Sequence, residues 1–248
     1  MDVPKQKSFD LLGMKPLAEA ANTLTKATVE GASAFLSRIC LPAAEEFGLL
    51  LRDKVSVWRA NNAAKIAQKA EQKYNELPAP EGRHAHPRLI AQIIEQGSWI
   101  EADDVQELWA GLLASSCTEH GQDDSNLIFI DLLARLTLSE ARILDHICRN
   151  TTKIVTDGGW IAADYFFMTL PELQKVSKIS DFHRLDRELD HLRTLGLIHD
   201  GFFSHSPNAN MTPTALALQM YVRCHGFIGN PLVFFRLHVP ENNEPISP

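Results

Sequence analysis

The sequence contains few cysteines and none of the cysteine spacings that mark a chemical site. Its four cysteines, Cys40, Cys117, Cys148 and Cys224, lie tens of residues apart, and no CxxC pair occurs. This excludes a zinc ribbon and a thioredoxin-like redox site. We expect reduced thiols in the core, because a chain of this size without a signal peptide seldom forms disulfides.

Long apolar runs are also missing. A membrane-spanning helix needs about 20 predominantly apolar residues, whereas the apolar stretch 31–51 is interrupted by Arg38, Glu45 and Glu46. Lysines occur near the start of the chain, but no apolar segment with a cleavage site follows them, as a secretory signal would require. We therefore expect a cytoplasmic protein.

The motifs of common enzymes and metal sites are absent too. No P-loop and no GxSxG nucleophile elbow occurs. The ten histidines give only isolated short-range pairs: His84 with His86, His146 with Cys148, and Cys224 with His225. A zinc site needs two such pairs, or one pair with a further ligand nearby. The sequence therefore predicts no catalytic, cofactor-binding or metal-binding residues, and we expect a protein that is not an enzyme.

What the sequence does contain is typical of a globular protein with uneven charge. Its 248 residues are 45% hydrophobic, which suffices for a sizeable core. The net charge is −7, but residues 1–80 carry +2, residues 81–140 carry −8 and residues 141–248 carry −1. This acidic balance excludes a uniformly basic nucleic-acid binder.

Residues 1–80 predict an amphipathic helical region. Apolar residues recur there at steps of three and four, which places them on one face of a helix; they are Leu36, Ile39, Cys40, Ala43, Phe47, Leu50, Leu51, Val55 and Trp58. A second helix is predicted over residues 58–77, and the proline-rich stretch 78–87 ends it. Three roles stay open for this region: it covers the core of the rest of the chain, it joins subunits, or residues 20–60 lie on a membrane surface.

Residues 87–136 predict a central acidic helical region. Helices are expected over residues 87–96, 102–115 and 127–136, with Asp103 or Asp104 capping the second of them. The apolar side of that second helix contains Leu108, Trp109 and Leu112, and we expect Trp109 to belong to the core rather than to a binding surface.

Residues 137–248 predict a winged-helix-like module that contains a few short strands. A helix is expected from Ser139. Thr169 to Glu172 match a capping box, and another helix is predicted from Asp181 to a C-terminal Gly196. A hairpin around Asp200–Gly201 within residues 197–205, a final helix capped at Thr212–Pro213 and a closing strand over residues 232–239 complete the module. The fold class expected for the whole chain is mainly α.

The second helix of this module is where a winged-helix protein would contact DNA. The candidate nucleic-acid contacts are Lys175, Lys178, Arg184 and Arg187. Phosphate contacts supply most of the affinity for DNA, so an exposed recognition face should be basic. Acids offset the arginines of this helix, namely Asp181, Asp186, Glu188 and Asp190. The sequence therefore disfavours direct DNA binding.

Two blocks of the chain carry a family resemblance. They are GSWIEADDVQELWAGLLASS and FIDLLARLTLSEARILDHI. The positions that carry it are Asp104, Glu107, Leu108, Trp109, Leu112, Leu113 and Ala114, then Leu138, Ser139, Glu140, Ala141, Ile143 and Leu144. On these residues the chain resembles the bacterial abortive-infection family called Abi-alpha. The upstream stretch LPAAEEFGLLLRDKVSVWRANN is also similar to the family's N-terminal helix, at Pro42, Glu46, Gly48, Asp53 and Trp58, so the resemblance spans roughly residues 36–225. The stretch after Gly229 lies outside that pattern.

The resemblance implies a role in phage defence, in which the infected cell stops growing before the phage matures. It supplies no catalytic residues, and it names neither the phage-derived trigger nor the cellular target. Our leading hypothesis is a defence protein that acts through protein contacts, including self-assembly, without cofactor or catalysis. A winged-helix transcriptional regulator and a membrane-active effector that uses its N-terminal helices are the alternatives.

Overall fold

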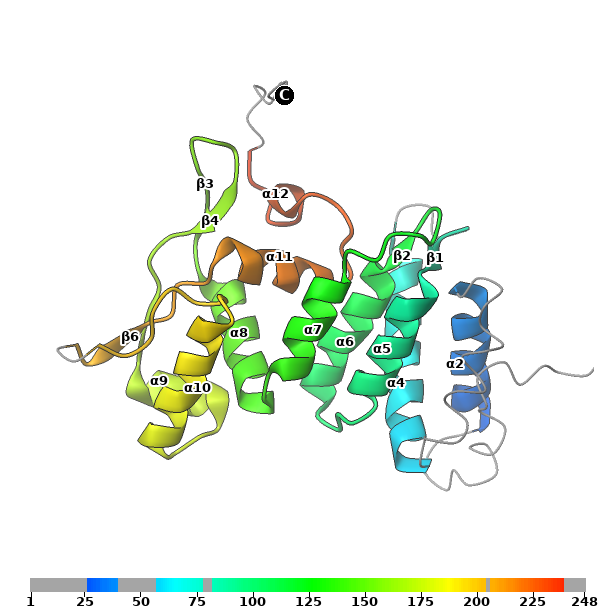
Figure 1. Ribbon diagram of the computed structural model, residues 1–248, viewed down its shortest axis with the longest axis horizontal. Coiled ribbons are helices and arrows are strands. Elements are labelled where there is room, and N and C mark those ends of the chain that lie inside the picture. The colour runs from blue at the N-terminus through cyan, green and yellow to red at the C-terminus, as the bar shows by residue number, and fades with distance from the viewer. Residues whose placement is uncertain (1–25, 40–56, 78–81, 204–205, 239–248) are drawn as a thin grey trace, which may run out of the picture. The chain divides into compact units, whose positions relative to one another are not determined.

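The computed structural model describes residues 26–39, 57–77, 82–203 and 206–238. In this part the chain is mainly α, with short antiparallel strands between the helices (Figure 1), which confirms the predicted fold class. The chain divides into two compact units, residues 1–127 and 128–248. The first unit contains the described part of the predicted N-terminal region and most of the central one.

The helices described in the first unit are α2 (Lys26–Ile39), α4 (Val57–Asn75), α5 (Pro87–Gly97) and α6 (Asp103–Ser115). Helix α4 packs against α2 on one side and against α6 on another, and α5 packs on α6. Buried alanines let the neighbouring helices approach α4 closely; they are Ala60, Ala63, Ala64, Ala67 and Ala70. Strands β1 (His84–Ala85) and β2 (Cys117–Thr118) pair antiparallel beside this layer.

The apolar face of α2 is buried within the first unit. Ala32, Phe35, Leu36 and Ile39 are all almost inaccessible to solvent, and α2 contacts α4. This part of the predicted amphipathic stretch therefore covers the core of its own unit. The predicted continuation of the apolar face over residues 40–55 lies outside the described residues, as do most of residues 20–60. Membrane contact through that stretch stays a prediction.

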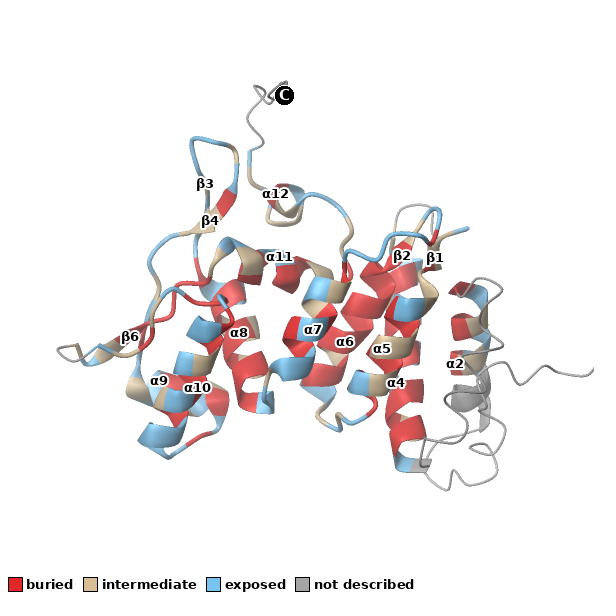
Figure 2. Cartoon of the chain, in the orientation of Figure 1, coloured by how far each residue is buried: buried red, intermediate tan, exposed pale blue. Residues whose placement is uncertain are grey.

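The second unit begins within α7 (Leu127–Arg135) and continues with α8 (Leu138–Asn150), α9 (Leu170–Ser177), α10 (Phe182–Thr194), α11 (Ala215–Cys224) and α12 (Pro231–Phe234). Helix α8 packs against α9, α10 and α11. Figure 2 shows the buried residues concentrated on the facing sides of these helices, with exposed residues on the outer sides of α9 and α10. The predicted capping box of α9 is confirmed, since Thr169 Oγ1 accepts from Glu172 N and Glu172 Oε2 accepts from Thr169 N.

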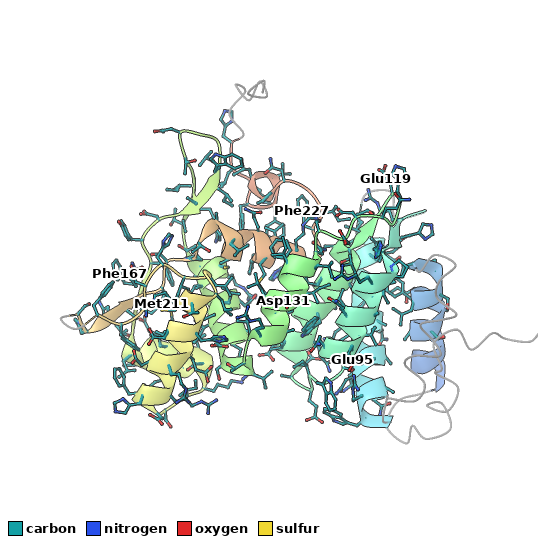
Figure 3. The ribbon with its side chains drawn as sticks, in the orientation of Figure 1. Glu95, Glu119, Asp131, Phe167, Met211 and Phe227 are labelled. Carbon is teal, nitrogen blue, oxygen red and sulfur yellow. The ribbon has the colours of Figure 1, made fainter. Side chains whose placement is uncertain are left out.

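Two antiparallel strand pairs accompany these helices. Strand β3 (Lys153–Val155) pairs with β4 (Ile161–Ala163), and β5 (Phe167–Thr169) pairs with β6 (Asn208–Asn210) with Phe167 opposite Asn210. Figure 3 labels Phe167 and Met211 near this second pair; Phe167 is exposed whereas Met211 is buried.

Three details of the predicted C-terminal module are wrong. The chain does not turn at Asp200–Gly201. Gly201 O accepts from Asn210 N at 2.8 Å, and the positive φ of Gly201 lets the chain continue past this residue without turning back. The cap of α11 is Thr214, whose Oγ1 accepts from Ala217 N. Residues 231–234 form helix α12 rather than a strand, because Asn230 caps a helix that starts with Pro231.

The start of α6 also differs from the prediction. Asp103 and Asp104 lie in the first turn of the helix, and the N-cap residue is Ala102, which makes no side-chain capping bond. The two acids therefore interact with the positive end of the helix dipole rather than cap it. Within the described residues, no helix combines the length and apolar character that crossing a membrane requires.

Candidate interaction surface

The family-motif positions on α6 are mostly part of the core. Trp109 is only 2% exposed, Leu112 is inaccessible to solvent, and Leu108 is buried as well. Trp109 is therefore a core residue, as predicted, and its side chain is not accessible to a partner. These three side chains fix the position of α6 in its unit.

Two acids of α6, Asp103 and the motif residue Glu107, connect this helix to α4. Glu107 contacts Lys69 and Lys73, the latter at 3.2 Å, and Asp103 lies 3.0 Å from Lys69. Partial burial raises the pKa of Glu107, but the hydrogen bonds and charges of the two lysines outweigh this and hold it below its ordinary value. Partial burial likewise lowers the pKa of Lys69, and its acidic partners outweigh that effect and raise it.

Asp104 is exposed in the first turn of α6, where its Oδ1 lies 3.1 Å from Val105 N. The motif's carboxylates therefore hold two helices together or lie at a helix start. Both are structural tasks for which no bound cation is needed.

Two tryptophans at the start of α4 and just after α5 form an exposed platform, which we call the Trp58–Trp99 platform. Trp58 is 39% exposed and Trp99 is 55% exposed. Their ring centroids lie 6.0 Å apart with the planes tilted by 56°. Glu101 accepts a hydrogen bond from Trp58 Nε1, so a carboxylate lies at the edge of the platform.

Arg59 holds the platform from inside the protein. Its side chain is almost fully buried, and its guanidinium carbon lies 4.2 Å from the ring centroid of Trp99. Arg59 Nε donates to Ser98 Oγ at 3.0 Å, and another nitrogen donates to Glu95 O at 3.0 Å. A second contact, 3.1 Å to Glu95 Oε2, pairs the buried charge. Figure 3 labels Glu95 on α5.

Further buried amides hold the backbone that carries Trp99. Asn62 Nδ2 donates to Ser98 O at 3.0 Å, and Gln106 Nε2 donates to Ile100 O at 2.7 Å. Gln106 Oε1 is buried and has no hydrogen-bond partner among the described residues. The turn after α5 is therefore fixed by side chains from α4 and α6, and the indole of Trp99 is presented at the surface in a set position.

A glycine allows this turn to lie so close to the core. A Cβ on Gly97 would lie 2.9 Å from Ile66 Cδ1 and 3.2 Å from Trp109 Cγ. The last residue of α5 can therefore only be small. Gly97 therefore packs against the buried Trp109, and the exposed Trp99 follows Gly97 two residues later in the chain.

The sequence did not reveal this platform. We predicted that Trp58 continues the apolar face that begins at Leu36, and we assigned Trp99 no role. The partners of the two rings come from residues about forty positions away in the chain, and a short-range pattern does not pair such residues. The one local signal was a tryptophan a few residues before an acidic helix start, which contains Glu101, Asp103 and Asp104.

The candidate nucleic-acid contacts are all exposed on the second unit. Lys175 lies on α9, and Lys178 ends that helix with a left-handed φ of 62°. Arg184 and Arg187 lie on α10, where Arg184 Nε is 3.2 Å from Glu188. Arg193 of the same helix pairs with Asp190. Acids of α10 therefore pair with two of its arginines and reduce the positive charge of this helix, as the sequence indicated.

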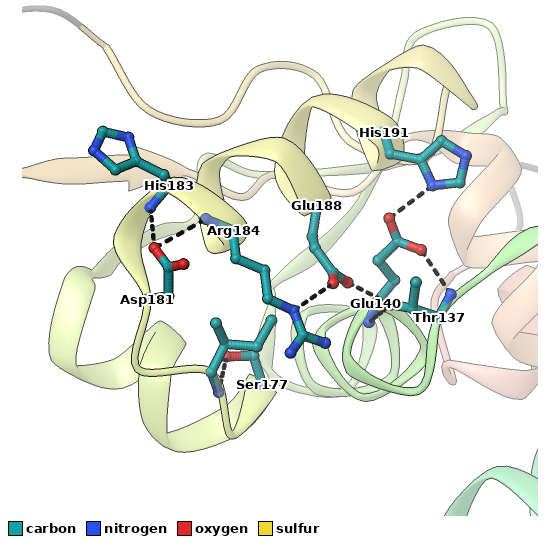
Figure 4. A network of polar contacts seen from close by, with 9 residues as sticks. Thr137, Glu140, Ser177, Asp181, His183, Arg184, Glu188 and His191 are labelled. Atoms are coloured by element: carbon teal, nitrogen blue, oxygen red, sulfur yellow. Dashed lines mark hydrogen bonds and ion pairs between the residues drawn. The ribbon is translucent and has the colours of Figure 1, made fainter.

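A buried polar network joins α8 to α10 in the second unit (Figure 4). Thr137 and Glu140 form the capping box of α8. Glu188 accepts from the hydroxyl of Thr137, and His191 Nδ1 lies 2.7 Å from Glu140 Oε1. The motif residue Glu140 thus holds a helix start and a neighbouring helix together.

The cysteine and histidine pairs noted in the sequence do not converge on one site. Within the described residues, no group of three or more His, Cys, Asp and Glu side chains has the geometry to hold a metal ion. His225 Nε2 lies 3.5 Å from Asp145 Oδ1, and Cys148 and Cys224 are buried free thiols.

Comparison with known proteins gives one match. Residues 59–216, more than half of the chain, match the family model described as abortive infection alpha. No curated protein and no solved structure matches the chain. The matched range includes Trp99, Trp109 and the polar network of α8 and α10, and it begins one residue after Trp58.

Proposed function

Because the chain belongs to the abortive infection alpha family, whose role is phage defence, we propose that it acts on the infected cell through contacts with a protein partner and without catalysis. The observation that supports this proposal is the Trp58–Trp99 platform. Two exposed indoles, Trp99 held by the buried Arg59 and Trp58 by Glu101, present rigid aromatic area to a partner, and tryptophan is among the residues that dominate the binding energy of protein interfaces.

A plaque assay tests the proposal in cells that express the full chain. We expect the unaltered chain to reduce plaque formation and the Trp58→Ala/Trp99→Ala double variant to lose most of that protection. Trp160→Ala is the matched control, because Trp160 is 75% exposed on the second unit. Purified double variant must show an unchanged melting temperature. Full protection by a folded double variant would overturn the proposal.

Self-assembly is one form of this proposal, in which the partner is a second copy of the chain. Light scattering on the purified full chain and on the double variant distinguishes it. An oligomer that becomes a monomer in the double variant identifies a second copy as the partner. A monomer in both cases assigns the platform to a different protein.

A second candidate function is DNA binding through a winged helix. We propose the winged-helix assignment on the order β5, α9, α10, β6, α11, with Ile198 bridged to Pro213 beside the β5–β6 pair. In the described part of the chain, Lys175, Lys178 and Arg187 form no ion pair, which favours an interaction with phosphates. A gel-shift assay with random-sequence duplex DNA tests it. Binding that the Lys175→Glu/Lys178→Glu/Arg187→Glu variant abolishes would support this function, and absence of binding at low salt would exclude it.

A further inference from the structure

The Trp58–Trp99 platform has a chemical preference of its own. The Arg59 guanidinium lies over the Trp99 ring, 4.2 Å from its centroid, and 55% of the Trp99 residue stays exposed to solvent. Trp58 adds a second indole at 6.0 Å. The faces of indole rings carry negative charge density and attract cations, and tryptophan does so more strongly than other aromatic residues.

The charges around the platform reinforce this preference. The buried Arg59 does not repel a second cation strongly, because Glu95 neutralises it at 3.1 Å. Glu101 lies at the edge of the platform, where it accepts the hydrogen bond of Trp58 Nε1. Within the first unit, the segment that carries Trp99, residues 81–127, has a net charge of −7. A positively charged group is therefore favoured at this surface and an acidic group is disfavoured.

We infer that the Trp58–Trp99 platform binds an arginine or lysine side chain of a protein partner, with the cation over the exposed indole surface and near Glu101. The inference rests on the proposed function, since it names the chemistry of the partner that the same platform would contact. Arg59 acts as a positioning residue: it stacks on Trp99 from inside and fixes the ring without touching the partner.

A fluorine NMR titration of the full chain tests the inference. The four tryptophans are replaced by 5-fluorotryptophan, and their signals are assigned with single Trp→Phe variants. The probe is the heptapeptide acetyl-ALRARLA-amide, and its counterpart with citrulline in place of both arginines keeps the shape without the charge. We expect the arginine peptide to shift the Trp58 and Trp99 signals at a concentration about tenfold lower than the citrulline peptide does. The Trp160 signal should not move.

Charge variants make the test specific. Glu101→Gln should weaken binding of the arginine peptide about threefold or more. Glu119→Gln, which removes the same charge from an exposed position of the same unit, should leave it unchanged. Equal binding of the two peptides, or no effect of Glu101→Gln, would overturn the inference.

The two proposals fail in different ways. If phage protection depends on the platform but the titration shows no preference for the charged peptide, the partner is not cationic and the proposed function stands. If the arginine peptide binds but the double variant protects cells fully, the platform recognises cations and the proposed function fails.

Discussion

His191 Nδ1 lies 2.7 Å from Oε1 of Glu140, and this contact joins the last turn of α10 to the first turn of α8. Glu140 is 1% exposed, and its other oxygen accepts from Thr137 N at 2.7 Å. A single buried carboxylate therefore completes a capping box and connects two helices. Glu188 of α10 also contacts both helices: it accepts hydrogen bonds from the hydroxyl of Thr137 before α8 and from Arg184 Nε on its own helix.

Thr137→Ala should destabilise the protein more than the equivalent change in the other capping box. Both Thr137 and Thr169 cap a helix, and loss of such a cap costs about 0.5–2 kcal/mol. Thr137→Ala also leaves the buried Glu188 with one partner fewer, which adds about 1–3 kcal/mol. Chemical denaturation of the two variants measures the difference. Equal losses of unfolding free energy would show that the Glu188 contact contributes little.

The helices with strong local signals were predicted well. The apolar spacing, the proline starts and the turn residues gave α5, α6, α7 and α10 to within a residue or two at their ends, and the capping box gave the start of α9. One error occurred where a contact with another part of the chain decides: Gly201 O accepts from Asn210 N, so the chain does not turn at Gly201. Another occurred at a local signal that we did not use: Asn230 and Pro231 start a helix at residues 231–234, where the apolar run predicted a strand.

The Trp58–Trp99 platform could not be predicted from the sequence either. A tryptophan such as Trp58 fits an apolar helical stripe whether it is buried or exposed, so its pattern does not distinguish the two. Trp58 Nε1 donates to Glu101, and Arg59 lies over the Trp99 ring; these partners come close to the rings only in the folded chain. The motif acids Glu107 and Glu140 were noticed in the sequence, but their partners were not.

Trp109→Ala should lower the unfolding free energy by about 3–5 kcal/mol, because a large side chain leaves a cavity in the core. Trp160→Ala removes the same side chain from an exposed position of the second unit and should change stability by less than about 0.5 kcal/mol. Thermal unfolding followed by calorimetry measures both. Similar melting temperatures for the two variants would contradict the buried position of Trp109.

Two glycine variants should change stability in opposite directions. Gly97→Ala places a methyl group against Ile66 and Trp109, and we expect a loss of about 1–3 kcal/mol from overpacking. Gly31→Ala adds a methyl group to an exposed position of α2 with no atom within 4 Å, so it should stabilise the protein by about 0.5–1 kcal/mol. Urea denaturation of both variants provides the comparison. Stabilisation by Gly97→Ala would show that α5 and α6 can move apart at no cost.

The contribution of Glu107 to stability should depend on pH at the acid end. Its pKa is lowered in the folded protein, so its contacts with Lys69 and Lys73 stabilise the fold above its ordinary pKa of 4.5. That contribution is lost as the pH falls through the folded value. The stability difference between the unaltered chain and Glu107→Gln should therefore be constant near neutral pH and shrink below about pH 4.5. Glu119→Gln is the control, and a difference that stays constant from pH 7 down to the acid unfolding of the protein would contradict the ion-pair assignment.

The raised pKa of Lys69 makes the complementary prediction at high pH. A cation whose folded pKa is raised stabilises the fold below its ordinary pKa of 10.5, and this contribution is lost as the pH rises through the folded value. Lys69→Met should therefore lose stability near pH 7, and its difference from the unaltered chain should shrink above about pH 10.5. Lys65→Met, which alters an exposed lysine of the same helix, is the matched control.

The buried cysteines should be unreactive in the native protein. Burial raises the pKa of Cys117 to about 12 and raises the pKa values of Cys148 and Cys224 as well. Burial thus disfavours the reactive thiolate form of each cysteine and also blocks the access of a reagent to the sulfur. In a Cys40→Ser variant, which removes the one cysteine outside the described residues, a disulfide-exchange reagent such as DTNB should label no thiol until denaturant is added. Rapid labelling of the native variant would mean that α8, α11 or the end of α6 opens readily.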